Sequence, residues 1–308
     1  MDESRRIVIC GHMAQPALDY MEEAGYELYL FPDLNEEAVE AASQAISIVV
    51  RSHSRITAEV LDLMPELKAV GRPGAGVENV DVDAAAARGV EIINVPGGNA
   101  PAVAEHTLAL MLALSRKLFL VAPALREGEW LKAGYEGGEI AGKTLALIGL
   151  GRVGVEVARR ALSMGMKVVA YDPYVSTAEA EELGVDIVEL EEALSSGDVI
   201  SLHAPATPET ERMLNAERLA MVKRGALLVN TSRGSLVDED ALLAALNEGG
   251  VAGAALDVFR QEPPAADSPL LRHPHVIATP HIAGASSEGR LRVSMALANR
   301  LVAYLSSD

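Results

Sequence analysis

Three polar residues in the last third of the chain could together bind an organic acid and move a proton on it. Arg233, Glu262 and His281 each follow a short apolar run that reads as a strand. A guanidinium can hold a carboxylate through two parallel hydrogen bonds and polarise an adjacent carbonyl. A histidine whose ring is oriented by a carboxylate can exchange the proton of a hydroxyl group. Because parallel strands end at one edge of a sheet, we expect an anion clamp, a carboxylate and a base to lie together there.

Each of these residues also has a structural interpretation. Arg233 could be a surface arginine at a turn, Glu262 a helix-capping acid, and His281 one of seven histidines satisfied by backbone groups. For each residue considered alone, we favour the structural interpretation. One residue alone therefore does not identify a catalytic site.

A glycine-rich turn in the middle of the chain indicates a bound dinucleotide. Gly149, Gly151 and Gly154 follow the apolar run 144–148 and open an alanine-containing helical segment. Glycines at these positions permit a tight turn, backbone approach to a pyrophosphate, and close packing of the helix on the strand. Asp172 follows about twenty residues later, where a carboxylate binds the ribose hydroxyls and repels a 2′-phosphate. The sequence therefore predicts NAD rather than NADP, and the alternative is an ordinary glycine turn of an α/β protein.

The pattern around this turn predicts two domains. Short apolar runs and helical segments alternate before residue 98, which indicates a small parallel sheet with helices on both faces. The segment 103–120 is too continuously apolar for a surface helix, so we expect it to be buried between domains. Residues 121–138 read as an irregular arm whose Trp130 and Tyr135 could pack on a partner subunit. A helical segment at 286–305 would fold back onto the first domain.

Composition narrows the function classes. The net charge of −18 argues against non-specific binding to nucleic acid or anionic membranes. The acidic residues between 179 and 192 are expected to be a solvated surface, and no metal site is predicted. The single cysteine, Cys10, cannot form an internal disulfide, and no run is long enough for a signal peptide or a membrane span. We therefore expect a cytoplasmic protein.

These motifs resemble, in order and over nearly the whole chain, those of the NAD-dependent D-2-hydroxyacid dehydrogenases. The resemblance rests on the glycine turn and on the segments 230–234, 255–259, 261–263 and 279–284. It implies that His281 is the acid/base, Glu262 its partner and Arg233 the clamp for the carboxylate and carbonyl of the substrate. It also implies a set of residues lining the NAD site, with Asp257 near the carboxamide. These are Gly149, Gly151, Arg152, Val153, Gly154, Asp172, His203, Thr231, Asp257 and Gly284.

The family resemblance implies an α/β fold of two doubly wound parallel-sheet domains. A Rossmann NAD-binding domain at 99–284 is inserted into a smaller flavodoxin-like substrate domain, formed by residues 1–98 plus 285–308. The resemblance also suggests a homodimer built around the long apolar helix and the Trp130 arm.

The first domain is similar to that of the D-3-phosphoglycerate dehydrogenases, a branch of this family. The similarity lies in segments 50–52, 70–81 and 94–99. Arg51 and Arg72 follow apolar strands and could bind a phosphate dianion in the cleft, or form salt bridges at a domain interface. Asn99 and the backbone of Ala75 and Gly76 could hold the carboxylate of the substrate. Pro73 and Ala75 stand in a turn that varies within the family.

The leading substrate pair is D-3-phosphoglycerate and 3-phosphohydroxypyruvate, in serine biosynthesis. Reduction of hydroxypyruvate or glyoxylate is the main alternative. Formate oxidation is disfavoured, because glutamine would then be expected at Glu262. The rival from another class is an NAD-sensing corepressor-like binding protein. Such proteins share this fold and even the arginine, glutamate and histidine, but we would expect a partner-binding groove and extra terminal segments. The given sequence stops at Asp308, so no regulatory extension and no serine feedback through one are expected.

Overall fold

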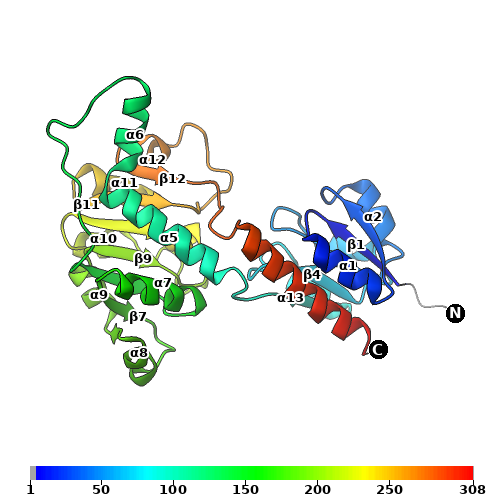
Figure 1. Cartoon of the computed structure of the whole chain (residues 1–308). Coiled ribbons are helices and arrows are strands. Elements are labelled where there is room, and N and C mark those ends of the chain that lie inside the picture. The colour runs from blue at the N-terminus through cyan, green and yellow to red at the C-terminus, as the bar shows by residue number, and fades with distance from the viewer. Residues whose placement is uncertain (1–4, 308) are drawn as a thin grey trace. The chain divides into compact units, whose positions relative to one another are not determined.

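The computed structural model describes residues 5–307, which form two compact units (Figure 1). The first unit contains the described residues up to Asn99 together with those from Ala285 onward, and the second spans Ala100–Gly284. One unit holds a sheet of five strands and the other a sheet of seven. Every pairing between neighbouring strands is parallel. The predicted class of two doubly wound α/β sheets is confirmed.

The first unit has the strand order β2-β1-β3-β4-β5, which is the flavodoxin-like order. Its strands are β1 (Arg6–Cys10), β2 (Glu27–Phe31), β3 (Ser47–Val49), β4 (Ala69–Arg72) and β5 (Glu91–Asn94). Its helices are α1 (Gln15–Glu23), α2 (Glu36–Ala42), α3 (Ala58–Asp62), α4 (Val82–Ala87) and the C-terminal α13 (Ser287–Leu305). Apolar residues of α1 and α13 pack on one face of the sheet, and those of α2 and α4 on the other. Cys10 lies in this core, and burial followed by the nearby Asp33 raises the pKa of its thiol to about 11.

The second unit has the order β8-β7-β6-β9-β10-β11-β12, which is the doubly wound 3-2-1-4-5-6 order with one further strand. Its strands are β6 (Thr144–Ile148), β7 (Lys167–Tyr171), β8 (Asp186–Ile187), β9 (Val199–Leu202), β10 (Ala226–Asn230), β11 (Val251–Leu256) and β12 (Val276–Ala278). Its helices are α5 (Ala100–Ser115), α6 (Leu118–Arg126), α7 (Arg152–Ser163), α8 (Thr177–Leu183), α9 (Leu190–Ser196), α10 (Ala216–Met221), the 3-10 turn η1 (Gly234–Leu236), α11 (Glu239–Asn247) and α12 (Pro269–Arg272). The strand order reverses between β6 and β9, which is where doubly wound sheets bind ligands.

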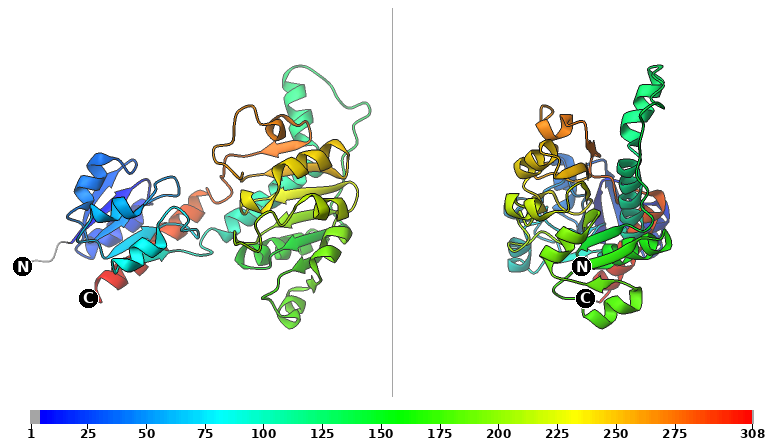
Figure 2. Two further views of the ribbon diagram at one scale, coloured as in Figure 1. Left: turned by 180° about the vertical axis from the view of Figure 1, so that it is seen from behind. Right: turned by 90° about the vertical axis from the view of Figure 1, so that its left-hand side faces the viewer.

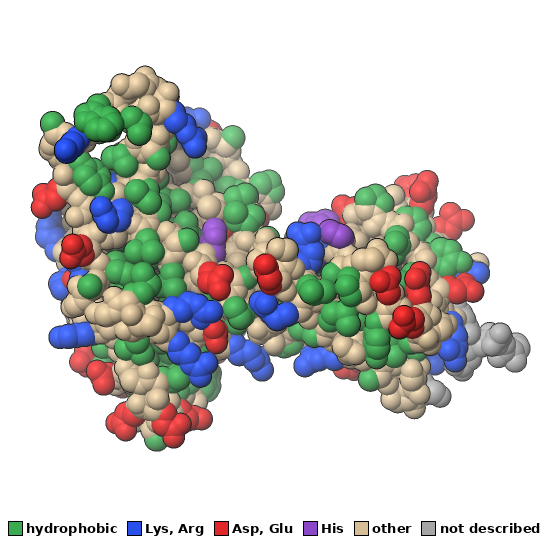
Figure 3. Space-filling model, viewed as in Figure 1, with side chains coloured by type: hydrophobic (Ala, Val, Ile, Leu, Met, Phe, Trp, Pro, Cys, Tyr) green, Lys and Arg blue, Asp and Glu red, His purple; other side chains and the backbone are tan. Residues whose placement is uncertain are grey.

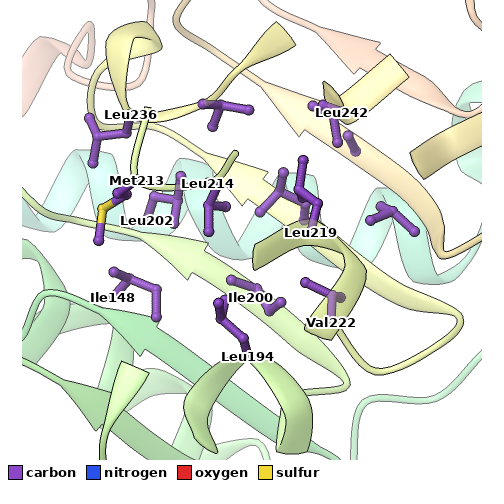
Figure 4. Close-up of a cluster of buried hydrophobic side chains, with 14 of the residues drawn as sticks. Ile148, Leu194, Ile200, Leu202, Met213, Leu214, Leu219, Val222, Leu236 and Leu242 are labelled. Carbon is purple, nitrogen blue, oxygen red and sulfur yellow. The ribbon is translucent and has the colours of Figure 1, made fainter. Parts of the chain in front are cut away.

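Buried apolar side chains cover both faces of the seven-stranded sheet. One cluster joins the strands to α9, α10 and α11, and Figure 4 shows Ile148, Ile200 and Leu202 of the central strands within it. The other cluster joins the sheet to α5 and α7. Because both faces are covered, the strands read in the sequence as continuous apolar runs rather than alternating ones. Polar loops that could bind a ligand then belong at the ends of the strands.

The prediction of one helix over residues 103–120 is wrong at its C-terminal end. The chain forms α5 and then α6, bent by 71° relative to α5, because Lys117 takes a left-handed conformation with φ of 47°. The break falls at the polar stretch Ser115 to Lys117, but apolar runs on both sides of it favour one continuous helix. Helix α6 also occupies part of the segment expected to be irregular. Within residues 5–307, no single helix is long and apolar enough to cross a membrane, although α5 and α6 together pass a test of length and composition.

Candidate active site

The sequence-predicted residues of the second unit all follow the carboxyl ends of its strands. In strand order they are Gly149 to Gly154 after β6, Asp172 after β7, His203 after β9, Thr231 and Arg233 after β10, Asp257 and Glu262 after β11, and His281 and Gly284 after β12. The strands pair in register at this edge, with Ile148 opposite Leu202 and Leu256 opposite Ala278. The loops therefore emerge side by side.

The glycine-rich turn is shaped by two close backbone approaches. Gly149 has φ of +102°, and a Cβ on it would lie 2.7 Å from the carbonyl carbon of His203. A Cβ on Gly154 would overlap the carbonyl oxygen of Gly149. Gly151, the N-cap of α7, has open space around it and offers no side chain to the first turn of the helix. The donors of that turn are left for a ligand, and an anion is the ligand that a helix N-terminus favours.

His203 adds an unsatisfied polar atom beside this turn. Its Nε2 lies 2.8 Å from the Ser201 hydroxyl. Its Nδ1 is buried and has no hydrogen-bond partner among residues 5–307. Burial lowers the pKa of the imidazole to about 4, so the ring is neutral at physiological pH. Buried nitrogen atoms normally have a hydrogen-bond partner, which indicates that a bound molecule or a water is the partner of this Nδ1.

Asp172 connects the glycine-rich turn to the next loop. Its Oδ2 accepts a hydrogen bond of 2.8 Å from the backbone N–H of Leu150, and its Oδ1 accepts one of 2.9 Å from Tyr174. Each oxygen keeps a second lone pair that can accept from a hydroxyl group. The carboxylate is thus held rigidly beside the turn, at the position expected for ribose.

His281 and Glu262 are in direct contact. The Nδ1 atom of His281 lies 2.7 Å from Oε2 of Glu262, while Oε1 accepts a hydrogen bond of 3.1 Å from the backbone N–H of Phe259. The side chains are 50% and 37% exposed, so the pair faces solvent rather than the core. Because Nδ1 is held by the carboxylate, Nε2 is the atom available to a substrate hydroxyl or carbonyl. Sequence order alone does not predict this contact.

Arg233 is presented by a locked turn at the end of β10. Its backbone carbonyl accepts a hydrogen bond of 2.9 Å from the buried side chain of Asn230, whose amide oxygen accepts one from Ser232 N–H at 3.1 Å. Nη1 of Arg233 donates to the Ser232 carbonyl at 2.8 Å. The Thr231 hydroxyl lies 2.7 Å from that of Thr107 on α5. The structure therefore places Thr231 in the support of the loop.

Asp257 holds the turn that carries His281. The residue is fully buried, and its carboxylate accepts hydrogen bonds from the Thr279 hydroxyl at 2.6 Å and from the N–H groups of Ile282 and Ala283 at 2.9 and 2.8 Å. Burial alone would raise the pKa of Asp257, but the nearby His106 and the hydrogen bonds from Thr279 and these N–H groups hold it below its usual value. One lone pair remains on Oδ2, so a carboxamide contact would have to use that position.

A cavity of about 180 Å³ lies elsewhere in the second unit. It is lined by residues at the amino ends of strands, including Val199, Leu227 and Gly253. None of the sequence-predicted residues lines it. The candidate site is thus defined by loop geometry at the opposite strand ends.

Comparison with known proteins identifies the family. Residues 108–283 match the family model described as "D-isomer specific 2-hydroxyacid dehydrogenase, NAD binding domain", which is more than half of the chain. The chain belongs to the D-isomer-specific 2-hydroxyacid dehydrogenases. The predicted family and the NAD-binding character of its glycine-containing unit are both confirmed.

Individual relatives agree with this assignment. A D-3-phosphoglycerate dehydrogenase from Archaeoglobus fulgidus is 42% identical over 298 residues, which are 96% of this chain and 56% of that protein. The chain thus spans about half the length of the curated relatives it matches. Among solved structures, the TT0316 protein of Thermus thermophilus has a TM-score of 0.89 at 38% identity, covering 98% of this chain and 97% of that one. A D-lactate dehydrogenase from Aquifex aeolicus, complexed with NAD and lactic acid, has a TM-score of 0.84 at 31% identity, covering 98% and 96%.

Two arginines expected to contact substrate lie near each other in the first unit. The side chain of Asn79 joins them, because its Nδ2 donates to the Arg51 carbonyl at 3.0 Å and its Oδ1 accepts from Nε of Arg72 at 3.3 Å. Burial, and then the charge of Arg290, lower the pKa of Arg51. Asn79 and Arg290 were not predicted, and the sequence holds no signal for Arg290 because it lies on α13, far along the chain.

The remaining predicted substrate residues have fewer hydrogen bonds that fix their positions. The Ala75 carbonyl accepts a hydrogen bond of 2.6 Å from the side chain of Asn94, which orients the turn after β4. Gly76 lies in the same turn and is partly buried. Asn99 is partly buried and directly precedes α5. Their contact with a carboxylate stays a prediction.

Proposed function

We propose that this dehydrogenase transfers a hydride between NAD and C2 of a D-2-hydroxy acid, with His281 as its acid/base. The observation that carries this proposal is the 2.7 Å contact between His281 and Glu262 at the sheet edge that also bears the glycine-rich turn. The bare N-terminus of α7 and the unsatisfied Nδ1 of His203 support dinucleotide binding there.

Each residue then has a defined task. NAD, when bound, supplies the carbon that takes or gives the hydride. Arg233 binds the carboxylate of the 2-oxo acid and polarises its carbonyl. Nε2 of His281 gives a proton to the oxygen at C2 during reduction and takes it during oxidation. Glu262 keeps the ring in the required tautomer and stabilises the imidazolium form.

We further propose that the substrate is phosphorylated, with D-3-phosphoglycerate and 3-phosphohydroxypyruvate as the leading pair, which would place the enzyme in serine biosynthesis. Burial, and then the charge of Arg290, lower the pKa of Arg51, and a dianion bound near Arg51 would stabilise its charge. Relatives named D-3-phosphoglycerate dehydrogenase support the same choice.

Replacing Arg72 with glutamine should weaken phosphorylated substrates selectively. Loss of a charge-assisted hydrogen bond to phosphate should lower kcat/KM for D-3-phosphoglycerate by about 10- to 100-fold. The value for D-glycerate, which has no phosphate, should change little. Steady-state kinetics on both substrates measures the difference. Arg88, which pairs with Asp62 elsewhere in the same unit, provides the matched control Arg88→Gln. Equal losses on both substrates would reject the phosphate role, and a wild type that prefers glyoxylate or hydroxypyruvate would favour that alternative.

We also propose a cytoplasmic homodimer formed through α6 and the arm of residues 121–138. Every residue of α6 is at least partly exposed, and Leu125, Trp130 and Leu131 of the arm are 55%, 74% and 45% exposed. The arm projects from the sheet of its own unit, and hydrophobic side chains gather on it (Figures 2 and 3). Apolar residues this exposed are typical of a subunit interface. A lone buried thiol, Cys10, is compatible with a reducing compartment.

The dimer can be tested with one substitution on the arm. Light scattering during gel filtration should give a wild-type mass about twice the chain mass of 32.5 kDa. Leu125→Glu should give a monomer, because a charge in an apolar interface is left without a partner. Trp130 is the single tryptophan, so dissociation should also shift its emission to the red. Leu30→Glu, at a leucine of the first unit that is 59% exposed, is the control and should stay dimeric. A dimer that survives Leu125→Glu would contradict the arm's role.

A further inference from the structure

His106, on the first half of α5, reaches the loop that follows β12. Its Nε2 atom lies 3.3 Å from the Thr279 hydroxyl and 3.6 Å from Oδ1 of Asp257. The imidazole side chain is 22% exposed, whereas the Asp257 side chain is fully buried. The next residue of α5, Thr107, bonds in the same way to Thr231 after β10. Two successive residues of α5 therefore brace two of the loops that carry site residues.

The hydrogen bonds define which atom donates at each step. The Thr279 hydroxyl donates a hydrogen bond of 2.6 Å to the Asp257 carboxylate, so its oxygen accepts a hydrogen bond from His106. His106 must then carry a hydrogen on Nε2. Both the neutral Nε2–H tautomer and the imidazolium satisfy this requirement, so the contact does not depend on titration of His106. His106 acts here as a donor and not as a base.

The far end of this chain of hydrogen bonds is the backbone around His281. The Asp257 carboxylate accepts hydrogen bonds from the N–H groups of Ile282 and Ala283. The backbone carbonyl of Asp257 accepts one of 2.8 Å from the N–H group of His281. Three successive N–H groups thus converge on one buried residue. His281 has φ of +52°, a left-handed conformation that a residue with a Cβ adopts only when its surroundings enforce it. The convergence on Asp257 provides that enforcement.

We propose that His106 is a positioning residue for the catalytic pair, acting through Thr279 and Asp257 to hold residues 281–283 so that His281 meets Glu262. Nothing places His106 against the substrate. Loss of the His106 side chain should change the orientation of His281 and not the binding of the 2-oxo acid. This inference rests on the proposed function for its kinetic part only.

The test compares His106→Leu with His106→Gln. The leucine variant lacks the donor, whereas a glutamine amide can place an N–H near the position of Nε2. In the leucine variant, kcat should fall about tenfold or more with little change in KM for the 2-oxo acid, because small displacements of a catalytic group are costly. Hydrogen exchange in a peptide covering residues 279–284 should become about tenfold faster. The glutamine variant should recover most of both.

Controls separate this role from general destabilisation. His275→Leu changes an exposed histidine just before β12, at the opposite end of that strand, and should leave exchange at 279–284 unchanged. Thr279→Val removes the intervening hydroxyl, so its effect and that of His106→Leu should be strongly non-additive in the double variant. Unchanged exchange and kcat in His106→Leu, or a glutamine variant as impaired as the leucine one, would overturn the proposal. A wild type inactive on every 2-hydroxy acid would defeat the proposed function alone, because the exchange measurement needs no turnover.

Discussion

Replacing His281 with alanine should reduce kcat by about 10²- to 10⁴-fold, the usual contribution of a positioned acid/base. The imidazole is held by Glu262 through Nδ1, so its loss removes the group that exchanges the proton at C2. The glycine-rich turn and Asp172 lie on other loops of the same edge and are not altered. NADH affinity, measured by fluorescence titration, should therefore stay within about twofold of wild type. A variant that loses NADH binding instead would show that His281 supports the cofactor site.

Glu262→Gln is the informative companion to this variant. Glutamine preserves the shape of the side chain and can still meet Nδ1 of His281, but it carries no charge to stabilise an imidazolium. We expect kcat to fall less than in His281→Ala. Equal rates in Glu262→Gln and wild type across the pH range would mean that Glu262 only caps the N–H of Phe259, to which it is also bonded.

The strands and the residues at their ends were predictable because the physics that creates them is local. Strands covered on both faces appear as apolar runs, and β6, β7, β9, β10, β11 and β12 are each followed by a polar residue or a glycine. Arg233, Glu262 and His281 could be found from the polar residues that come after each apolar run. The glycine-rich turn could be found because Gly149 must tolerate a backbone carbonyl where a Cβ would be. The bend at Lys117 between α5 and α6 is marked only by the short polar stretch Ser115 to Lys117, which an exposed turn of one continuous helix would also show.

The supports of the site could not be predicted, because they connect residues that are far apart in the chain. His106 and Thr279 are separated by 173 positions, and His106 belongs to none of the motifs found in the sequence. Asn79 reaches Arg51 and Arg72 through hydrogen bonds that depend on the three-dimensional turn. The sequence predicts Asp257 as a site residue from family resemblance, but not that most of its lone pairs are occupied by the turn it holds. Polar residues at strand ends can be recognised in a sequence, whereas the hydrogen bonds that hold them in position depend on the fold.

Replacing Arg233 with alanine should lower kcat/KM for every 2-oxo acid by about 10²- to 10³-fold, the cost of losing a donor aimed at a developing oxyanion. The turn that presents Arg233 is held by the side chain of Asn230 through backbone atoms, so the substitution leaves the loop in place. Arg233→Lys should recover only part of the loss, because a lysine keeps the charge but cannot bind a carboxylate through two parallel hydrogen bonds. Arg260→Ala, at an exposed arginine of the neighbouring loop, is the matched control.

Chemical rescue distinguishes a substrate clamp from a structural arginine. If the guanidinium of Arg233 acts on the substrate, low concentrations of guanidinium chloride should restore part of the activity of Arg233→Ala but not that of Arg233→Lys, whose side chain still fills the position. The restored activity should saturate with guanidinium concentration, since the added ion binds at a defined place. The loss should be equal for phosphorylated and unphosphorylated acids, because both carry the carboxylate and carbonyl that Arg233 would bind. A loss confined to phosphorylated acids would assign Arg233 to the phosphate and leave the carboxylate to other groups.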